Sequence, residues 1–488
     1  MWQAPAAAPS RRYDAQFDLN QSYPTCFDAC WGVQRLAIWP AGPAISWPDR
    51  RRRPLLGSNG LRLSAMADKY SIPQQLGAKA RRSFHVMAKP AGSTCNLDCQ
   101  YCFYLSKERL PKGPGTGSMS DETLELFIRQ YIEGVTGPEV VFSWQGGEPT
   151  LRGLDFFRSV VALQKKYAKP NQRIENDLQT NGVLIDESWA AFLKDNRFLV
   201  GLSIDGPREL HDKYRVNKGG APTFDKVMAA ANLLRKHGVR FNTLTCVHRG
   251  NASRPLDVYR FLRRELDSTA IQFIPIVEPK DFETHAPQSR DQLQLPILGS
   301  PEARPGHPRS VVTDWSVDPD EYGYFLSRVF DEWVRKDLGK VLVSQFETLV
   351  AQHLGLPSQI CIYSEVCGKN VAIEHDGSLY SCDHYVYPEH RLGSLRETPL
   401  DQMVFSPTQV KFGYAKSETL PRYCRECPFK TDCWGECPRN RLIRTPEGEP
   451  GLNYLCSGLR RFFKHAIPEV EQMVRDIRRE AKSVLPRA

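Results

Sequence analysis

From residue 83 onward, the hydrophobic positions of the chain alternate between two kinds of spacing. Short apolar runs such as 139–144 (EVVFSW) and 198–204 (FLVGLSI) are followed by segments in which apolar residues recur every three or four positions, as in 121–134 and 224–237. The first kind of spacing predicts strands buried in a sheet, and the second predicts amphipathic helices. Strands and helices that alternate in this way call for a parallel sheet covered by helices.

Six strands and the helices that join them follow from this pattern. Their number and length fit an open, partial (β/α)6 barrel better than a closed eight-fold barrel. Ser120 is the expected N-cap of the first helix. A Pro-rich polar insertion at 278–317 has no strong period, and further helices are predicted at 319–337 and 459–482. The predicted strands are 84–90, 139–144, 173–180, 198–204, 239–247 and 270–277, and the helices among them are 121–134, 154–168, 186–195, 224–237 and 255–266.

Residues 1–65 differ from the rest of the chain. They hold seven prolines and four of the nine tryptophans, and they show no sustained period of either kind. Met66 then opens a stretch that looks like an ordinary protein start. We expect residues 1–65 to be a disordered or spurious extension that results from a misplaced start codon. A targeting peptide is the alternative, and the four aspartates in this segment argue against it.

Composition excludes some classes of function. The chain has 488 residues, which suggests two or three domains. Its net charge is +9, and the eight arginines and four aspartates of residues 1–65 account for +4 of that. The rest of the chain therefore lacks the strong positive charge of a nucleic-acid-binding protein. No apolar run approaches 18 residues, so we expect no membrane span. Neither nucleic acid nor a membrane is an expected partner.

Three cysteines spaced C-x3-C-x2-C, namely Cys95, Cys99 and Cys102, carry the most specific chemical signal. Thiolates on one short loop can bind one face of an iron–sulfur cluster, which usually has four ligands. Three ligands leave one iron open to a small molecule. A structural zinc loop is the alternative, and it would need a fourth Cys or His nearby, which the next thirty residues do not supply.

The predicted strand ends carry a second signal. The first strand runs into the cysteine loop, and each of the next three is followed by a polar segment that contains glycine. Any one of these segments alone would indicate a turn. Ligands bind at the carboxyl ends of parallel strands, so four such ends together indicate a binding site. The three segments are Gln145-Gly146-Gly147-Glu148-Pro149, Gln179-Thr180-Asn181-Gly182 and Ser203-Ile204-Asp205-Gly206-Pro207.

The cysteine loop, with Tyr101 before its last cysteine and Phe103 after it, resembles the signature of the radical S-adenosylmethionine (SAM) superfamily. The resemblance implies a [4Fe–4S] cluster whose open iron binds the amino and carboxylate groups of SAM. It also implies that the GGEP segment contacts the SAM amino group and that Ser203 and Arg215 contact its carboxylate or ribose; a surface salt bridge is an equal alternative for Arg215. The residues implied in SAM binding are Tyr104, Gln145, Gly146, Gly147, Glu148, Ser203 and Arg215.

Eight further cysteines lie between Cys361 and Cys456. Their spacing resembles the SPASM domain, which holds two auxiliary [4Fe–4S] clusters in peptide-modifying radical SAM enzymes. Two zinc sites and a disulfide framework are the alternatives, and the thiol-based SAM motif in the same chain argues against disulfides. The resemblance assigns Cys361, Cys367, Cys382 and Cys437 to the first auxiliary cluster and Cys424, Cys427, Cys433 and Cys456 to the second.

Residues 83–465 as a whole resemble anaerobic sulfatase-maturating enzymes, through CNLDCQYCFYL, QGGEPTL, QTNG, LSIDGP and the segment around Asp383. The resemblance implies oxidation of a Cys or Ser in a C/S-x-P-x-R segment of a sulfatase to formylglycine, with SAM and three [4Fe–4S] clusters as cofactors. Asp383 would be the base that takes the substrate proton, and we expect burial beside a cluster to raise its pKa. A surface aspartate in a turn is the alternative for this residue.

The expected partners are an unfolded or nascent sulfatase polypeptide and a low-potential electron donor such as flavodoxin or ferredoxin, in the cytoplasm. Another SPASM enzyme that crosslinks a ribosomal peptide is the main alternative, and an iron–sulfur electron carrier or a zinc-stabilised binding module is a more distant one. The choice between Cys and Ser substrates and the roles of Cys26, Cys30 and Cys246 stay open; Cys246 is expected to pack inside a strand. The expected regions are the extension 1–65, the partial barrel 83–317, a linking helical segment 318–360, the SPASM domain 361–465 and a C-terminal helix 466–488.

Overall fold

The computed structural model describes residues 83–484 except residues 111–112, 288 and 290. The extension expected at residues 1–65, with Cys26 and Cys30, lies outside the described residues. Within the described part, none of the helices is both long and apolar enough to cross a lipid bilayer.

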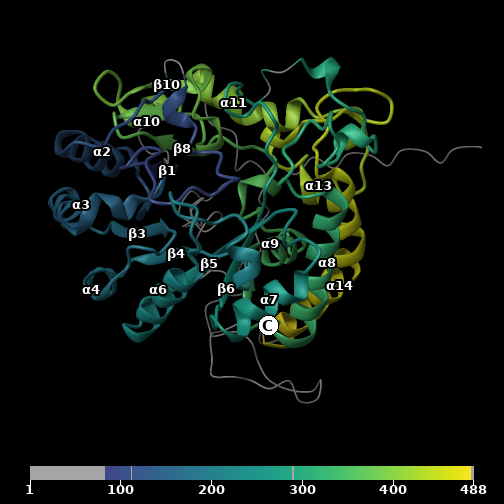
Figure 1. Cartoon of the computed structure of the whole chain (residues 1–488), viewed down its shortest axis with the longest axis horizontal. Helices are drawn as coiled ribbons and strands as arrows, with labels where there is room; N and C mark the ends of the chain where they lie inside the picture. The colour runs from purple at the N-terminus through teal and green to yellow at the C-terminus, as the bar shows by residue number, and fades with distance from the viewer. Residues whose placement is uncertain (1–82, 111–112, 288, 290, 485–488) are drawn as a thin grey trace, which may run out of the picture.

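One twisted sheet forms the centre of the described chain (Figure 1). Strands β1 to β6 run parallel in chain order, which confirms the predicted parallel sheet, and two of the predicted strands have the predicted bounds. The strands are β1 His85–Ala88, β2 Glu139–Trp144, β3 Arg173–Thr180, β4 Leu199–Ser203, β5 Phe241–Val247, β6 Ala270–Pro275, β7 Leu342–Val343, β8 Asn370–Ile373, β9 Ser378–Tyr380 and β10 Arg391–Ser394, in the spatial order β10-β9-β8-β1-β2-β3-β4-β5-β6-β7.

Every predicted helix is present, with bounds that differ by at most three residues at its start and two at its end. The Ser120 side chain accepts a hydrogen bond from the Thr123 amide, as expected for an N-cap. Helices of the barrel lie along the outer side of the strands, and α8 and α14 run side by side at the opposite edge (Figure 1). The longer helices are α2 Asp121–Gly134, α3 Gly153–Tyr167, α4 Glu187–Asp195, α6 Phe224–Lys236, α7 Pro255–Arg264, α8 Pro319–Lys336, α9 Ser344–His353, α11 Pro407–Glu418 and α14 Cys456–Val484.

Shorter elements complete the described chain. In the described residues of the insertion at 278–317, the regular elements are two single-turn 3-10 helices, in agreement with its lack of a period. The remaining short helices are α5 Arg208–His211, α10 Leu400–Val404, α12 Arg422–Arg425 and α13 Lys430–Cys433, and the other 3-10 turns include Lys107–Arg109 and Asp383–Tyr385.

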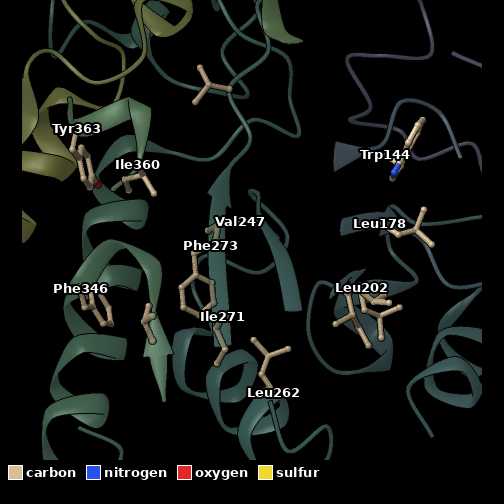
Figure 2. Packing of buried hydrophobic residues seen from close by; sticks show 14 of the residues in the cluster. Trp144, Leu178, Leu202, Val247, Leu262, Ile271, Phe273, Phe346, Ile360 and Tyr363 are labelled. Atoms are coloured by element: carbon tan, nitrogen blue, oxygen red, sulfur yellow. The ribbon is translucent and has the colours of Figure 1, made fainter. Parts of the chain in front are cut away.

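The two faces of the sheet differ in polarity because side chains alternate along each strand. Phe142 and Trp144 of β2 are fully buried among the outer helices. Figure 2 shows this apolar layer between sheet and helices, which includes Phe273 of β6 and Phe346 of α9. Ser143 points to the other face, where its hydroxyl donates to the Asp177 carboxylate of β3 at 2.5 Å. The inner face thus carries buried polar groups, together with a small apolar cluster of Val141, Leu244 and Ile274.

The cysteine-rich region joins this sheet, which the sequence pattern did not predict. Strand β8 pairs parallel with β1, with His85 opposite Asn370, and β9 and β10 extend the sheet antiparallel. The Lys89 amide donates to the Ile373 carbonyl at 2.9 Å just beyond the paired strands. This pairing brings the end of β1 beside the segment that follows β8.

Candidate active site

The loop from Gly92 to Tyr104 follows β1 and carries the three motif cysteines. Their thiols lie close enough to interact electrostatically with one another. The Cys102 amide donates to the Cys99 carbonyl at 2.9 Å. Burial raises the pKa of the Cys95 thiol to about 12. A bound metal cluster would reverse that shift, because coordination deprotonates thiols.

The donor set fits an iron–sulfur cluster. Three convergent thiols on one backbone turn are the ligands that such a cluster requires from this loop. A zinc loop instead needs its ligands gathered around a single ion. Within the described residues, no three Cys, His, Asp or Glu side chains are grouped closely enough to hold one metal ion.

The two glycines after β2 let the cysteine loop approach the sheet closely. The Gly147 amide donates to the Gly92 carbonyl at 2.9 Å, and the Glu148 amide donates to the Thr94 carbonyl at 2.9 Å. A Cβ at position 147 would lie 2.0 Å from the Thr94 carbonyl oxygen. Glycine at this position is therefore required by packing of backbone on backbone.

Glu148 is a buried carboxylate that joins the ends of β2 and β3. One of its oxygens accepts from the Thr150 amide at 3.0 Å and from the Thr180 hydroxyl at 2.9 Å, and the other accepts from the Asn181 amide at 2.8 Å. Burial raises the pKa of Glu148, and these hydrogen bonds oppose the rise. Neighbouring Gln145 has a buried side-chain nitrogen without a partner within the described residues. Their contact with SAM stays a prediction.

Arg215 forms a buried ion pair after β4. Its Nε donates to Asp205 at 2.9 Å, and Tyr101 of the cysteine loop donates to the same carboxylate oxygen at 2.5 Å. Arg215 is only 7% exposed, so the alternative of a surface salt bridge is wrong. Burial alone would raise the pKa of Asp205, but the Arg215 guanidinium and His248 outweigh it and the pKa is lowered. Contact of Arg215 with SAM stays a prediction.

Several residues of this cluster were missed by sequence reasoning. Asp205 belongs to the polar segment already noted after the fourth strand but was given no role of its own. His248 directly follows β5, so the strand ends were the available signal. Cys246 lies within β5 as expected, and its sulfur is 3.6 Å from Nη2 of Arg215, on the side of the cysteine loop. Ser203, at the end of β4, accepts from the Gln179 side chain at 2.6 Å.

Asp383 lies at the end of β1, paired with Lys89. The Lys89 ammonium forms an ion pair with its carboxylate, and the two side chains are 2% and 13% exposed. The expected rise in the pKa of Asp383 is wrong: burial acts in that direction, but the Lys89 ammonium and His384 outweigh it, so the pKa is lowered. The Lys89 ammonium therefore favours the ionised form of this carboxyl group.

Further charged groups surround this pair. The Tyr104 hydroxyl donates to Glu374, which directly follows β8, and the Lys89 ammonium lies 4.7 Å from the centre of the Tyr104 ring. Tyr104 is thus on the Asp383 side of the loop, and its contact with SAM stays a prediction. Arg439 forms an ion pair with Glu278 and donates to His384 at 2.8 Å. Glu374 and Lys89 were not among the predicted residues.

The eight thiols of the cysteine-rich region fall into two neighbourhoods. The Cys382 thiol lies in the field of Cys437 and Cys361, and the Cys367 thiol lies in that of Cys361. The Cys456 thiol lies in the field of the other three, which are Cys433, Cys424 and Cys427. This grouping supports the predicted quartets, whose assignment to two clusters stays a prediction.

A polar hollow opens on the outer side of the cysteine loop. It has a volume of about 320 Å³. Two of its lining residues are joined by a backbone hydrogen bond, from the Gln100 amide of the loop to the Tyr214 carbonyl at 3.1 Å. Two cationic and two aromatic side chains face it. The lining residues are Gln100, Lys213, Tyr214, Arg249, Asp314 and Trp315.

Comparison with known families identifies two regions of the chain. Residues 90–262 match the radical SAM superfamily, and residues 361–428 match an iron–sulfur cluster-binding domain, SPASM. These matches confirm the predicted fold class and the predicted cofactors, SAM and iron–sulfur clusters.

Relatives that align over most of the chain have one activity in common. A serine-type anaerobic sulfatase-maturating enzyme of Bacteroides thetaiotaomicron is 44% identical and covers 81% of this chain and 92% of its own length. A cysteine-type anaerobic sulfatase-maturating enzyme of Clostridium perfringens is 35% identical, with 80% and 99% covered. The solved structure "Native anSMEcpe with bound AdoMet and Cp18Cys peptide" has a TM-score of 0.68 and 34% identity, with 80% and 99% covered. The chain therefore belongs to the family of anaerobic sulfatase-maturating enzymes, which are radical SAM enzymes.

Proposed function

We propose that this enzyme oxidises a serine or cysteine in a C/S-x-P-x-R segment of an unfolded or nascent sulfatase to formylglycine (3-oxoalanine). The observation that carries the proposal is the ionised, buried Asp383 beside Lys89, on the same side of the cysteine loop as Tyr104. The peptide bound in the solved relative supports a polypeptide substrate.

The residues divide into three proposed roles. Cys95, Cys99 and Cys102 hold the SAM cluster, and the two quartets of the cysteine-rich region hold the auxiliary clusters. When bound, the reduced cluster and SAM would supply the radical chemistry that removes a hydrogen atom from the substrate Cβ. The SAM-binding residues are the set predicted above, from Tyr104 to Arg215.

Asp383 supplies the acid–base part of the reaction. After loss of the Cβ hydrogen, the substrate must release one proton from its hydroxyl or thiol and one electron. Serine then gives the aldehyde directly, whereas cysteine gives a thioaldehyde that water hydrolyses to the aldehyde with release of hydrogen sulfide. The Asp383 carboxylate takes the proton, since its partner Lys89 keeps it ionised before the reaction. The cluster that the adjacent cysteine quartet would hold would supply the acceptor for the electron, and Cys382 of this quartet is the neighbour of Asp383 in the chain.

Asp383→Asn tests this role. The amide keeps the shape of the side chain and cannot accept the proton, so we expect SAM cleavage to continue while formylglycine formation falls by about 100-fold or more. Mass spectrometry of the peptide and chromatography of 5′-deoxyadenosine measure the two quantities. Asp195→Asn, at the exposed end of α4, is the matched control. Formylglycine at the wild-type rate in Asp383→Asn would show that another group is the base.

We also propose that a flavodoxin delivers the priming electron at the hollow beside the cysteine loop. Lys213 and Arg249 suit an acidic partner, and Tyr214 and Trp315 suit the flat edge of a flavin. Arg249→Glu should slow reduction by flavodoxin and leave reduction by dithionite unchanged. If a reduced ferredoxin is affected and flavodoxin is not, the partner is an iron–sulfur protein instead.

A further inference from the structure

Lys107 is a buried lysine that the proposed reaction does not use. It begins the 3-10 turn after the cysteine loop, and its side chain is 1% exposed. Its ammonium lies 3.4 Å from the centre of the Tyr387 ring. Among the residues that the structure describes, no oxygen accepts a hydrogen bond from this ammonium and no carboxylate forms an ion pair with it.

The charged groups around Lys107 are those of the proposed active site. Three carboxylates act on its charge from nearby, and each of them has another partner at closer range. These pairs are Glu278 with Arg439, Asp383 with Lys89, and Glu374 with the Tyr104 hydroxyl.

An ammonium in this position lacks an acceptor for its N–H groups. Contact with an aromatic face compensates only part of the lost hydration of a buried cation. Burial, followed by the neighbouring Arg439, lowers the pKa of Lys107 to about 7. The amine keeps N–H donors whether it is protonated or neutral, so its ability to donate does not depend on its charge. An oxygen atom of a bound molecule would complete the site.

We propose that Lys107 donates a hydrogen bond to the hydroxyl oxygen of a substrate serine, and that this contact makes the enzyme prefer serine over cysteine. The inference rests on the proposed function, because it places the substrate side chain beside Asp383. A thiol sulfur accepts hydrogen bonds only weakly, so a cysteine substrate gains little from the same donor. Lys107 is therefore a specificity-determining residue.

Two peptides that differ only in the target residue, S-x-P-x-R and C-x-P-x-R, test the inference. We expect Lys107→Met to lower kcat/KM for the serine peptide by about 5- to 100-fold, the range for a buried polar group left without its hydrogen-bond partner, and to change the cysteine peptide by less than about 3-fold. Affinity for each labelled peptide, measured by fluorescence anisotropy, should show the same selectivity without turnover. Lys165→Met, on the exposed face of α3, is the matched control.

Lys107→Gln keeps a donor of similar length and should recover part of the serine activity, which protects the test if Lys107→Met loses iron or folds poorly. Equal losses with both peptides would overturn the inference, because they would place Lys107 on a backbone group that both peptides share. An unchanged ratio with full activity would overturn it as well. Failure of the proposed function looks different: the wild-type enzyme would cleave SAM and modify neither peptide.

Discussion

Replacing Gly147 by alanine tests how the cysteine loop is held on the sheet. The new Cβ would lie 2.0 Å from the Thr94 carbonyl oxygen and 2.6 Å from the Ser93 carbonyl oxygen. Non-bonded contacts of this kind below about 3 Å are strongly repulsive, so one backbone must move by about 1 Å. The atoms that the new Cβ would meet belong to the backbone of Ser93 and Thr94, so no side chain can rotate away to relieve the contact.

The displaced segment is the one that carries Cys95. A shift of about 1 Å is enough to lower the rate of a positioned reaction by about 100-fold, and overpacking of this size destabilises a fold by about 1–3 kcal/mol. We therefore expect Gly147→Ala to lose affinity for SAM and to hold up to four fewer iron atoms per chain, since one four-iron cluster depends on this loop.

Iron and sulfide analysis of the anaerobically reconstituted protein measures the loss, and SAM binding is followed by equilibrium dialysis. Gly137→Ala is the matched control, because a Cβ at position 137 meets only Val135 Cγ1, at 4.0 Å. If Gly147→Ala carries the full iron content and binds SAM as the wild type does, the loop is not held by this contact and the reasoning is refuted.

Three further predictions concern buried charges. The pKa of Lys107 falls from 10.5 in the unfolded chain to about 7 in the fold. Between these two pH values the unfolded chain binds a proton that the folded protein does not, so lowering the pH from about 10 to about 7 destabilises the wild type. The loss relative to Lys107→Met is a few kcal/mol in total. The thermal midpoint of Lys107→Met should thus exceed that of the wild type most at pH 7 and least near pH 10, and a constant difference would contradict the burial of a titrating amine. Asp205→Asn removes one partner of the buried pair with Arg215 and should destabilise the protein by about 3–5 kcal/mol, measured by calorimetry; an unchanged midpoint would show that the pair is solvated. Glu148→Gln has one acceptor oxygen in place of two and should lose about 1–3 kcal/mol, so hydrogen exchange at the Asn181 amide should accelerate; unchanged exchange would argue against the bond to Glu148.

The barrel was predictable because its signals are local. Strand β2 and helix α2 have the predicted bounds. A short apolar run defines the strand, and the capping Ser120 together with a helical spacing of apolar residues defines the helix. Strands β8 to β10 have three or four residues each. Runs this short carry no measurable period, and their pairing with β1 joins segments that are far apart in the sequence. Local patterns do not contain that information.

The site was predictable where a motif fixes it and not where electrostatics decide. Cysteine spacing identified the cluster ligands as candidates through its resemblance to known motifs, and the division of the eight later cysteines into two quartets came from that resemblance alone. The state of Asp383 depends instead on Lys89, which β1 and β8 bring beside it. Burial alone predicted a raised pKa for this carboxyl, and a single opposite charge reverses the sign. An ion pair such as Lys89 with Asp383 is created when the fold brings two distant segments together, and neither segment predicts it alone.

The most direct test of the central claim uses a peptide that contains S-x-P-x-R with deuterium at the Cβ of the serine. The reconstituted enzyme is incubated anaerobically with SAM and a reductant, and both products are analysed by mass spectrometry. The account predicts an aldehyde at the serine position and transfer of one deuterium per turnover into 5′-deoxyadenosine. SAM cleavage without deuterium transfer, or with an unmodified peptide, would contradict it.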